Sequence, residues 1–92
     1  MSSKIRTVYK YELRLGDYVT VPLPKGAEII YVAVQADCPY LWARVDPDPQ
    51  VPVESRRFRI AGTGHRLGTD VGRHIGSFML QDGALVFHVF EA

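Results

Sequence analysis

The chain has 92 residues, of which 47% are hydrophobic and 23% charged, a balance typical of a single globular domain rather than of a disordered or fibrous chain. Its formal net charge of +1 provides no general attraction to nucleic acid or to a membrane surface, so we expect neither as a partner. The chain has no apolar run long enough to span a membrane, no recognisable signal peptide and a single cysteine, Cys38, which together predict a cytoplasmic protein.

Alternating apolar and polar residues, interrupted by turn sequences, predict β-strands along the whole chain. The predicted strands are residues 4–13, 18–23, 27–35, 40–45, 54–61, 74–80 and 84–91. No segment shows helical periodicity uninterrupted by glycine or proline. The sequence therefore predicts an all-β fold, with residues 1–92 forming a single-domain antiparallel sandwich or barrel of about seven strands.

Three features predict where individual strands lie in their sheets. Pro22 and Pro24 lack a backbone N–H, so the strand that contains them should end at a sheet edge or outside the sheet. Residues 27–35 are apolar on both faces, which predicts a central strand or an oligomer contact. Asp82-Gly83 predicts a tight hairpin before the last strand, which is nearly all apolar and should be central.

The region from residue 55 to residue 70 is the main candidate for a ligand site. Its candidate residues are Arg57, Arg59, Gly62, Thr63, Gly64, His65 and Arg66. Glycines let backbone amides point at an anion, so the loop of residues 62–73 and the arginines could bind a nucleotide. In the alternative interpretation, the glycines adopt positive backbone angles in a wide connection, because no helix follows them. Arg57 and Arg59 would then form a solvated strand face, neutralised by carboxylates such as Asp46 or Glu54.

The histidines and the cysteine predict neither a metal site nor a catalytic centre. His65, His74 and His88 lack the spacing typical of metal ligands, so we expect no metal and no cofactor. His88 lies in an apolar strand and should be a hydrogen-bonded residue of the core or of a sheet face. Cys38 should be a small buried or half-buried residue in a turn.

A second candidate surface is aromatic. Tyr40, Trp42 and Arg44 lie in phase on one predicted strand, and Tyr31 lies on the strand before it. Aromatic residues and arginine are over-represented among the residues that anchor protein interfaces. We therefore take these four as candidate interface residues if their side chains are exposed, while a buried Trp42 would simply belong to the core.

Several stretches together resemble one family of proteins. They are residues 24–30, 40–46, 57–65, 75–78 and 85–91, and the most specific are Leu41-Trp42-Ala43, Gly62-Thr63-Gly64-His65 and Phe87-His88-Val89-Phe90. These stretches resemble a family of short, uncharacterised proteins encoded by tailed bacteriophages and prophages. The resemblance implies a phage origin and a chain that is complete as one domain, and it implies no activity.

Three functional hypotheses follow, none of them enzymatic. The first is a non-catalytic accessory module that contacts a host or phage protein in the infected cell, with homo-oligomers formed by pairing of edge strands. The second is binding or sequestration of a small anion such as a nucleotide by the loop of residues 62–73. The third is a minor structural protein of the virion.

Overall fold

The structure, a computed structural model, describes residues 5–92 and contains seven antiparallel strands. They are β1 (Thr7–Glu12), β2 (Tyr18–Pro24), β3 (Glu28–Gln35), β4 (Cys38–Val45), β5 (Val53–Gly62), β6 (His74–Leu80) and β7 (Leu85–Glu91). The predicted all-β fold is confirmed, and every predicted strand is present with bounds shifted by a few residues at most, except that residue 4 of the first predicted strand lies outside the described residues. Within the described residues there is no helix that could span a membrane.

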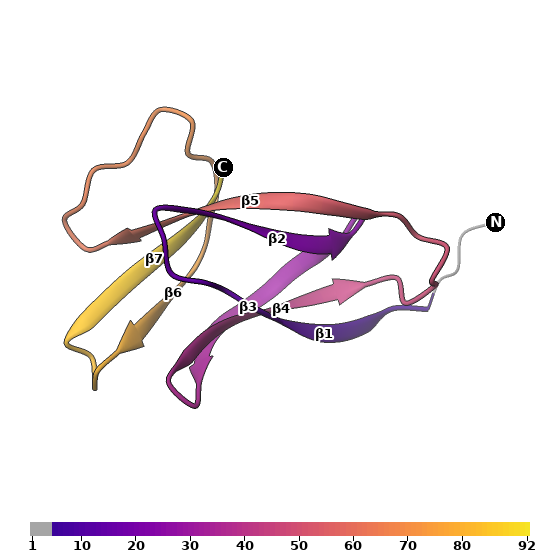
Figure 1. Cartoon of the computed structure of the whole chain (residues 1–92), viewed down its shortest axis with the longest axis horizontal. Helices are drawn as coiled ribbons and strands as arrows, with labels where there is room; N and C mark the ends of the chain where they lie inside the picture. Colours follow the sequence, from indigo (N-terminus) through magenta and orange to yellow (C-terminus); the bar gives the residue numbers. More distant parts are fainter. Residues whose placement is uncertain (1–4) are drawn as a thin grey trace.

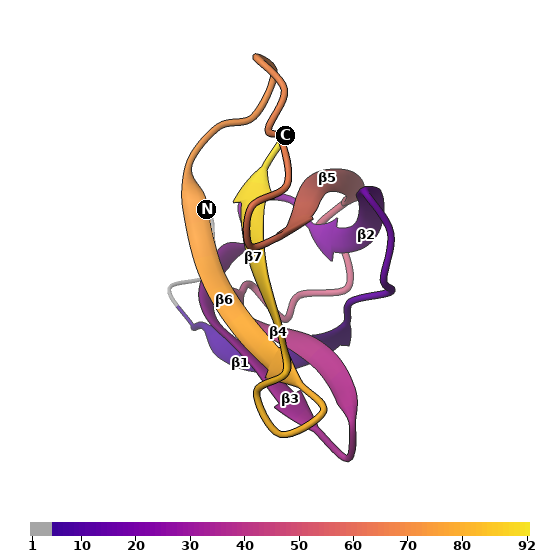
Figure 2. The same cartoon turned by 90° about the vertical axis from the view of Figure 1, so that its left-hand side faces the viewer.

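The strands form two sheets that pack face to face as a sandwich. The three-stranded sheet has the order β1-β4-β3, and the four-stranded sheet has the order β2-β5-β7-β6. Figure 1 shows β2 and β5 along one side of the molecule and β1 and β4 along the other. Figure 2 shows β6 and β7 side by side, with β3 and β4 reaching the same end of the sandwich.

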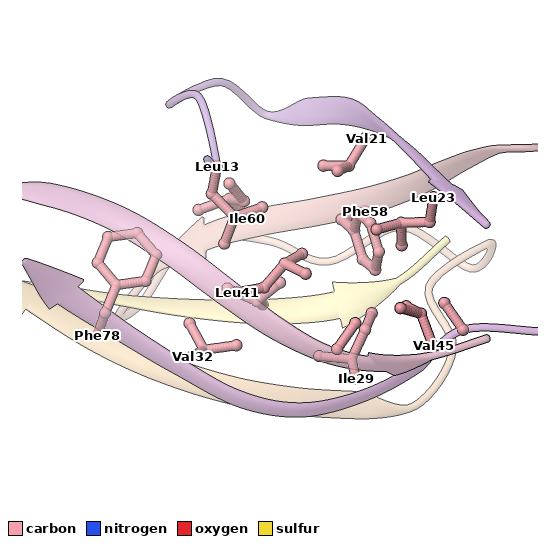
Figure 3. Close-up of a cluster of buried hydrophobic side chains, with 13 residues drawn as sticks. Leu13, Val21, Leu23, Ile29, Val32, Leu41, Val45, Phe58, Ile60 and Phe78 are labelled. Atoms are coloured by element: carbon pink, nitrogen blue, oxygen red, sulfur yellow. The ribbon is translucent and has the colours of Figure 1, made fainter. Parts of the chain in front are cut away.

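The core lies between the two sheets and is built from alternate residues of each strand. Phe58 of β5 is 0% exposed, and Leu23, Leu41 and Val45 are also fully buried. Figure 3 shows Leu23 and Phe58 pointing from the four-stranded sheet towards Val45 on the opposite sheet. Successive side chains of a strand point to opposite faces, so the residues between these core positions project outwards. This alternation gives each sheet one solvent-facing surface.

The observed strand order confirms two of the three predictions about strand position. The proline-containing β2 is an edge strand, and the apolar β7 is central. The prediction of a central position for residues 27–35 is wrong, because β3 is an edge strand of the three-stranded sheet. On the inner face, Val32 packs against β6, where a Cβ added at Gly76 would lie 3.0 Å from the Val32 Cβ. The sheets are therefore closed against each other along β3 and β6. On the outer face, Ile30 and Tyr31 are exposed, and the alternative of an oligomer contact stays a prediction.

Two tight turns connect neighbouring strands with backbone angles that side chains rarely adopt. Between β3 and β4, Ala36 and Asp37 have φ values of 49° and 64°. The predicted hairpin between β6 and β7 is also present, with Gln81 and Asp82 in the same left-handed region, followed by Gly83 at φ 87°. Neither Ala36 nor Gln81 is a residue type that favours this region, so both turns carry some strain.

Candidate functional site: an aromatic sheet face

The outer surface of the three-stranded sheet carries the aromatic residues that the sequence singled out. On β4, Leu41 is buried, whereas Tyr40, Trp42 and Arg44 point to the other side of the strand. Antiparallel pairing places Tyr31 of β3 opposite Trp42. All four candidate interface side chains therefore lie on one solvent-facing surface, which we call the aromatic face.

A β-bulge in β3 is responsible for the position of Tyr31. The register between β3 and β4 shifts between Ile29 and Tyr31, so Ile30 has no partner of its own. Ile29 and Val32 are both buried although they are three residues apart, which a regular strand does not allow. Without the bulge, Tyr31 would share the face of Ile29 and point into the core. With it, the Tyr31 side chain is 59% exposed.

The aromatic rings contact one another at steep angles. The Trp42 ring centroid lies 5.4 Å from that of Tyr31 and 6.2 Å from that of Tyr40, with interplanar angles of 53° and 59°. The rings therefore form a ridged surface rather than one flat platform.

Charged side chains border the aromatic rings and leave the face without a dominant sign. The Lys10 Nζ lies 4.5 Å from the centroid of the Tyr40 ring and donates a hydrogen bond of 2.8 Å to Gln35. Arg44 forms an ion pair with Glu28 on the neighbouring strand. Two cations with a carboxylate nearby do not create the strongly positive field that a nucleic-acid interface requires.

Arg59, a candidate ligand-binding residue, holds two loops in place. Its side chain is only 8% exposed. The guanidinium donates hydrogen bonds to the carbonyl oxygens of Asp17 at 3.2 Å, Ile60 at 2.7 Å and Arg66 at 2.8 Å. These bonds attach the connection before β2 and the loop of residues 62–73 to β5. The guanidinium is thus occupied by the protein's own backbone.

Arg57 lies on the same sheet face, as predicted, and it too has partners within the chain. Its guanidinium carbon lies 4.1 Å from the centroid of the Tyr18 ring, and its Nη2 lies 3.7 Å from Asp70. The Tyr18 hydroxyl donates a hydrogen bond of 3.0 Å to Asp70. This hydrogen bond raises the pKa of the Tyr18 phenol, because ionisation would remove the donor and place two negative charges together.

The carboxylates that neutralise these two arginines are not those expected from the sequence. Asp46 pairs with Arg6, and Glu54 pairs with Arg56. Asp70 and Asp17 come instead from connections that fold back over the strand. They lie in loops, where residue alternation gives no information on which strand they contact.

The glycine-rich loop leaves β5 and returns beside the C-terminus (Figure 1). The His65 ring packs on Gly62, with its Cε1 3.0 Å from where a Cβ would lie, so a side chain at this position would displace the ring, and Gly64 has φ +88°. Next to them is an open depression of about 320 Å³, lined by Gly62, Thr63, His65, Ala84, Leu85, Val86 and Phe87. Its lining is mainly apolar and contains neither Arg57 nor Arg59. The structure therefore does not bring the candidate ligand residues to a single open site.

A chain of hydrogen bonds crosses the outer surface of the four-stranded sheet. The Ser77 Oγ lies 2.8 Å from His88 Nδ1 and 3.1 Å from His74 Nε2, and His88 Nε2 lies 2.8 Å from the Thr63 Oγ1. His88 is thus a hydrogen-bonded sheet-face residue, as predicted. Ser77 was not singled out, because only the pairing of β6 with β7 places it opposite His88.

Two further observations concern metal ligands and the cysteine. Among residues 5–92, no group of three His, Cys, Asp or Glu side chains is arranged to hold a metal ion. Cys38 is exposed at the start of β4, so the prediction of a buried or half-buried residue is wrong. The two-residue turn before it leaves this strand end open to solvent, and only the following residue, Pro39, turns inwards.

Fold and surface together define a small two-sheet β-sandwich with an aromatic patch on the outer face of one sheet. Residues 4–92 match the domain of unknown function DUF7352, and because this match spans nearly the whole chain, the protein belongs to that family. The expected membership of an uncharacterised family is thereby confirmed. Comparisons with curated proteins and with solved structures give no significant match.

Proposed function

We propose that this protein is a non-catalytic binding module and that its aromatic face contacts another protein. The observation that carries the proposal is the clustering of Tyr31, Tyr40 and Trp42 on one solvent-facing surface, with Arg44 beside them. Tyrosine, tryptophan and arginine are the residue types most enriched at the energetic centres of protein interfaces. Tyr31 is exposed, whereas Tyr40 and Trp42 are half-buried, so the cluster leaves part of its aromatic surface open to a partner.

We further propose that the protein is encoded by a phage or prophage and acts in the cytoplasm of the infected bacterium. The support is the resemblance of residues 24–30, 40–46 and 57–65 to short proteins of tailed phages. Its partner would then be a host or phage protein. A place in the virion is the competing location, and mass spectrometry of purified particles tests it.

The test uses Trp42→Ala and Tyr31→Ala in binding experiments with the tagged full-length chain. A partner is captured from bacterial lysate, identified and purified, and its Kd for each variant is then measured by calorimetry. We expect each substitution to weaken binding at least about tenfold, as is usual for aromatic residues at the centre of an interface. Both side chains lie outside the core, so the variants should remain folded.

Met79→Ala is the matched control, because Met79 is an exposed apolar residue on the opposite sheet. It should leave the Kd unchanged. If a purified partner bound the Trp42→Ala variant as tightly as it binds the unaltered chain, the aromatic face would not be the binding surface.

A small anion such as a nucleotide is the competing class of ligand, and the contacts of its candidate residues favour it less. Arg59 is used by backbone carbonyls, Arg57 is paired with Asp70, and the depression beside His65 is mainly apolar. Thermal-shift measurements with mono-, di- and cyclic nucleotides test this class. A ligand at 100 times its Kd should stabilise the chain by about 2.7 kcal/mol.

A further inference from the structure

The two sheets have four edges, and three of them are closed or interrupted. The edges formed by β3 and β6 pack against each other through Val32 and Gly76. The edge formed by β2 contains Pro22 and Pro24, which cannot donate backbone hydrogen bonds. The remaining edge is β1, six residues without proline or glycine, which pairs with β4 on one side and with no other described strand. Such an edge is a template for another strand.

The one lysine of β1, Lys10, does not extend over this edge. Natural edge strands commonly carry a lysine that extends over the edge and blocks pairing. Here Lys10 lies across its own sheet, with its ammonium group over the Tyr40 ring on β4 and hydrogen-bonded to Gln35 on β3. Lys10 therefore does not block pairing along this edge, and the other charged residue of β1 is Glu12 at its end.

Apolar and polar surface beside β1 is also uncovered. Tyr9 lies on the inner side of the sheet, opposite the buried Ala43, yet it is 49% exposed. Next to it an open groove of about 530 Å³ runs between the two sheets. This groove is lined by Tyr11, Glu12, Arg14, Val19, Thr20, Val21 and Pro22. An additional strand on β1 would cover this open side of the sandwich.

We propose that β1 pairs antiparallel with β1 of a second copy of this chain, with the two-fold axis at Tyr9. In this register Val8 lies opposite Lys10 of the other copy, and Thr7 lies opposite its Tyr11. Continuing the pairing by one residue at each end sets Glu12 opposite Arg6 of the other copy, twice by symmetry. Both residues project to the outer surface of the sheet. Arg6 already lies 3.6 Å from Asp46 of its own chain, so Glu12 of the other copy would join this ion pair as a second carboxylate at each end of the joined strands.

Self-pairing would also enlarge the aromatic face. Two sheets of order β1-β4-β3 would join into one continuous sheet whose outer surface carries both aromatic clusters. A partner with two-fold symmetry, or with two copies of a short motif, would then engage both clusters at once. This inference does not depend on the proposed function, because the edge pairs through backbone groups and not through Tyr31 or Trp42.

A charge-swap experiment tests the proposed register. Glu12→Arg sets two arginines opposite each other at both ends of the joined strands. We expect its dimer dissociation constant, measured by sedimentation equilibrium from micromolar to millimolar concentration, to rise on the order of tenfold. The double variant Arg6→Glu and Glu12→Arg reverses the pair and should restore dimerisation. Arg66→Glu, an exposed charge reversal in the loop of residues 62–73, is the control and should have no effect.

Amide hydrogen exchange provides a readout of where the copies meet. Amides of β1 should exchange more slowly as the concentration of unaltered protein rises, while those of β2 should not change. A chain that stays monomeric at millimolar concentration would overturn the proposal. So would a dimer that Glu12→Arg does not weaken, or one whose protected amides lie outside β1. A monomer whose β1 amides become protected only with a different protein would assign the edge to that protein instead.

Discussion

Arg59 shows how a single residue can serve the fold when its residue type suggests binding. Its nearly buried guanidinium donates to carbonyls of three separate segments. Arg59→Met should keep the aliphatic volume but leave these carbonyls unpaired, and we expect it to lower the free energy of unfolding by about 3 kcal/mol. Urea unfolding measures the loss. The control is Arg66→Met, which removes an exposed arginine from the loop of residues 62–73. Equal stability of the two variants would contradict this role.

Tyr18 supplies a contact that depends on pH. Its hydrogen bond to Asp70 raises the pKa of the Tyr18 phenol in the folded state above the ordinary value of 10.0. The hydrogen bond therefore stabilises the folded protein fully below pH 10. This contribution should be lost as the pH rises through the folded-state pKa. The melting temperature should therefore fall more steeply above pH 10 for the unaltered chain than for Tyr18→Phe, which has no phenol to ionise at this position. Parallel curves for the two proteins would exclude this contact as the cause.

At the scale of elements, the turn between β3 and β4 holds the two strands that carry the aromatic face. Ala36 and Asp37 both have positive φ values, as in two-residue turns that favour Asn-Gly. The double variant Ala36→Asn and Asp37→Gly should relieve strain and raise the free energy of unfolding by about 1–2 kcal/mol. Thermal unfolding measures the gain. Ala84→Asn, in a turn position without positive φ, should give none, and a similar gain there would rule out the backbone explanation.

At the scale of the whole molecule, the two sheets differ in what covers them. The loop of residues 62–73 is held over part of the four-stranded sheet by Arg59, by Asp70 and by its return to Glu91. No described segment covers the aromatic face of the other sheet in the same way. If both proposals hold, Trp42→Ala should weaken partner binding at least about tenfold without affecting dimerisation. Glu12→Arg should weaken the dimer while each monomer still binds its partner.

Much of the fold and part of the candidate site could be predicted because they depend on local geometry. Alternation of side chains along a strand is sufficient to place Tyr40, Trp42 and Arg44 on one face and Leu41 on the other. It does not predict the outward position of Tyr31, since the bulge at Ile30 changes the phase only when β3 pairs with β4. The burial of Arg59 was missed for a similar reason, because the loop that covers it returns from residues later in the chain.

The amino-acid sequence by itself determined the β-class of this protein, the position of its strands and the edge position of the proline-containing β2. These properties follow from side-chain periodicity and from the missing N–H of proline, which are features of short segments. Only the tertiary structure decided that β3 closes against β6 and that β1 pairs with no second strand among residues 5–92. Such neighbours are chosen by packing between residues far apart in the chain, and no short segment contains that information.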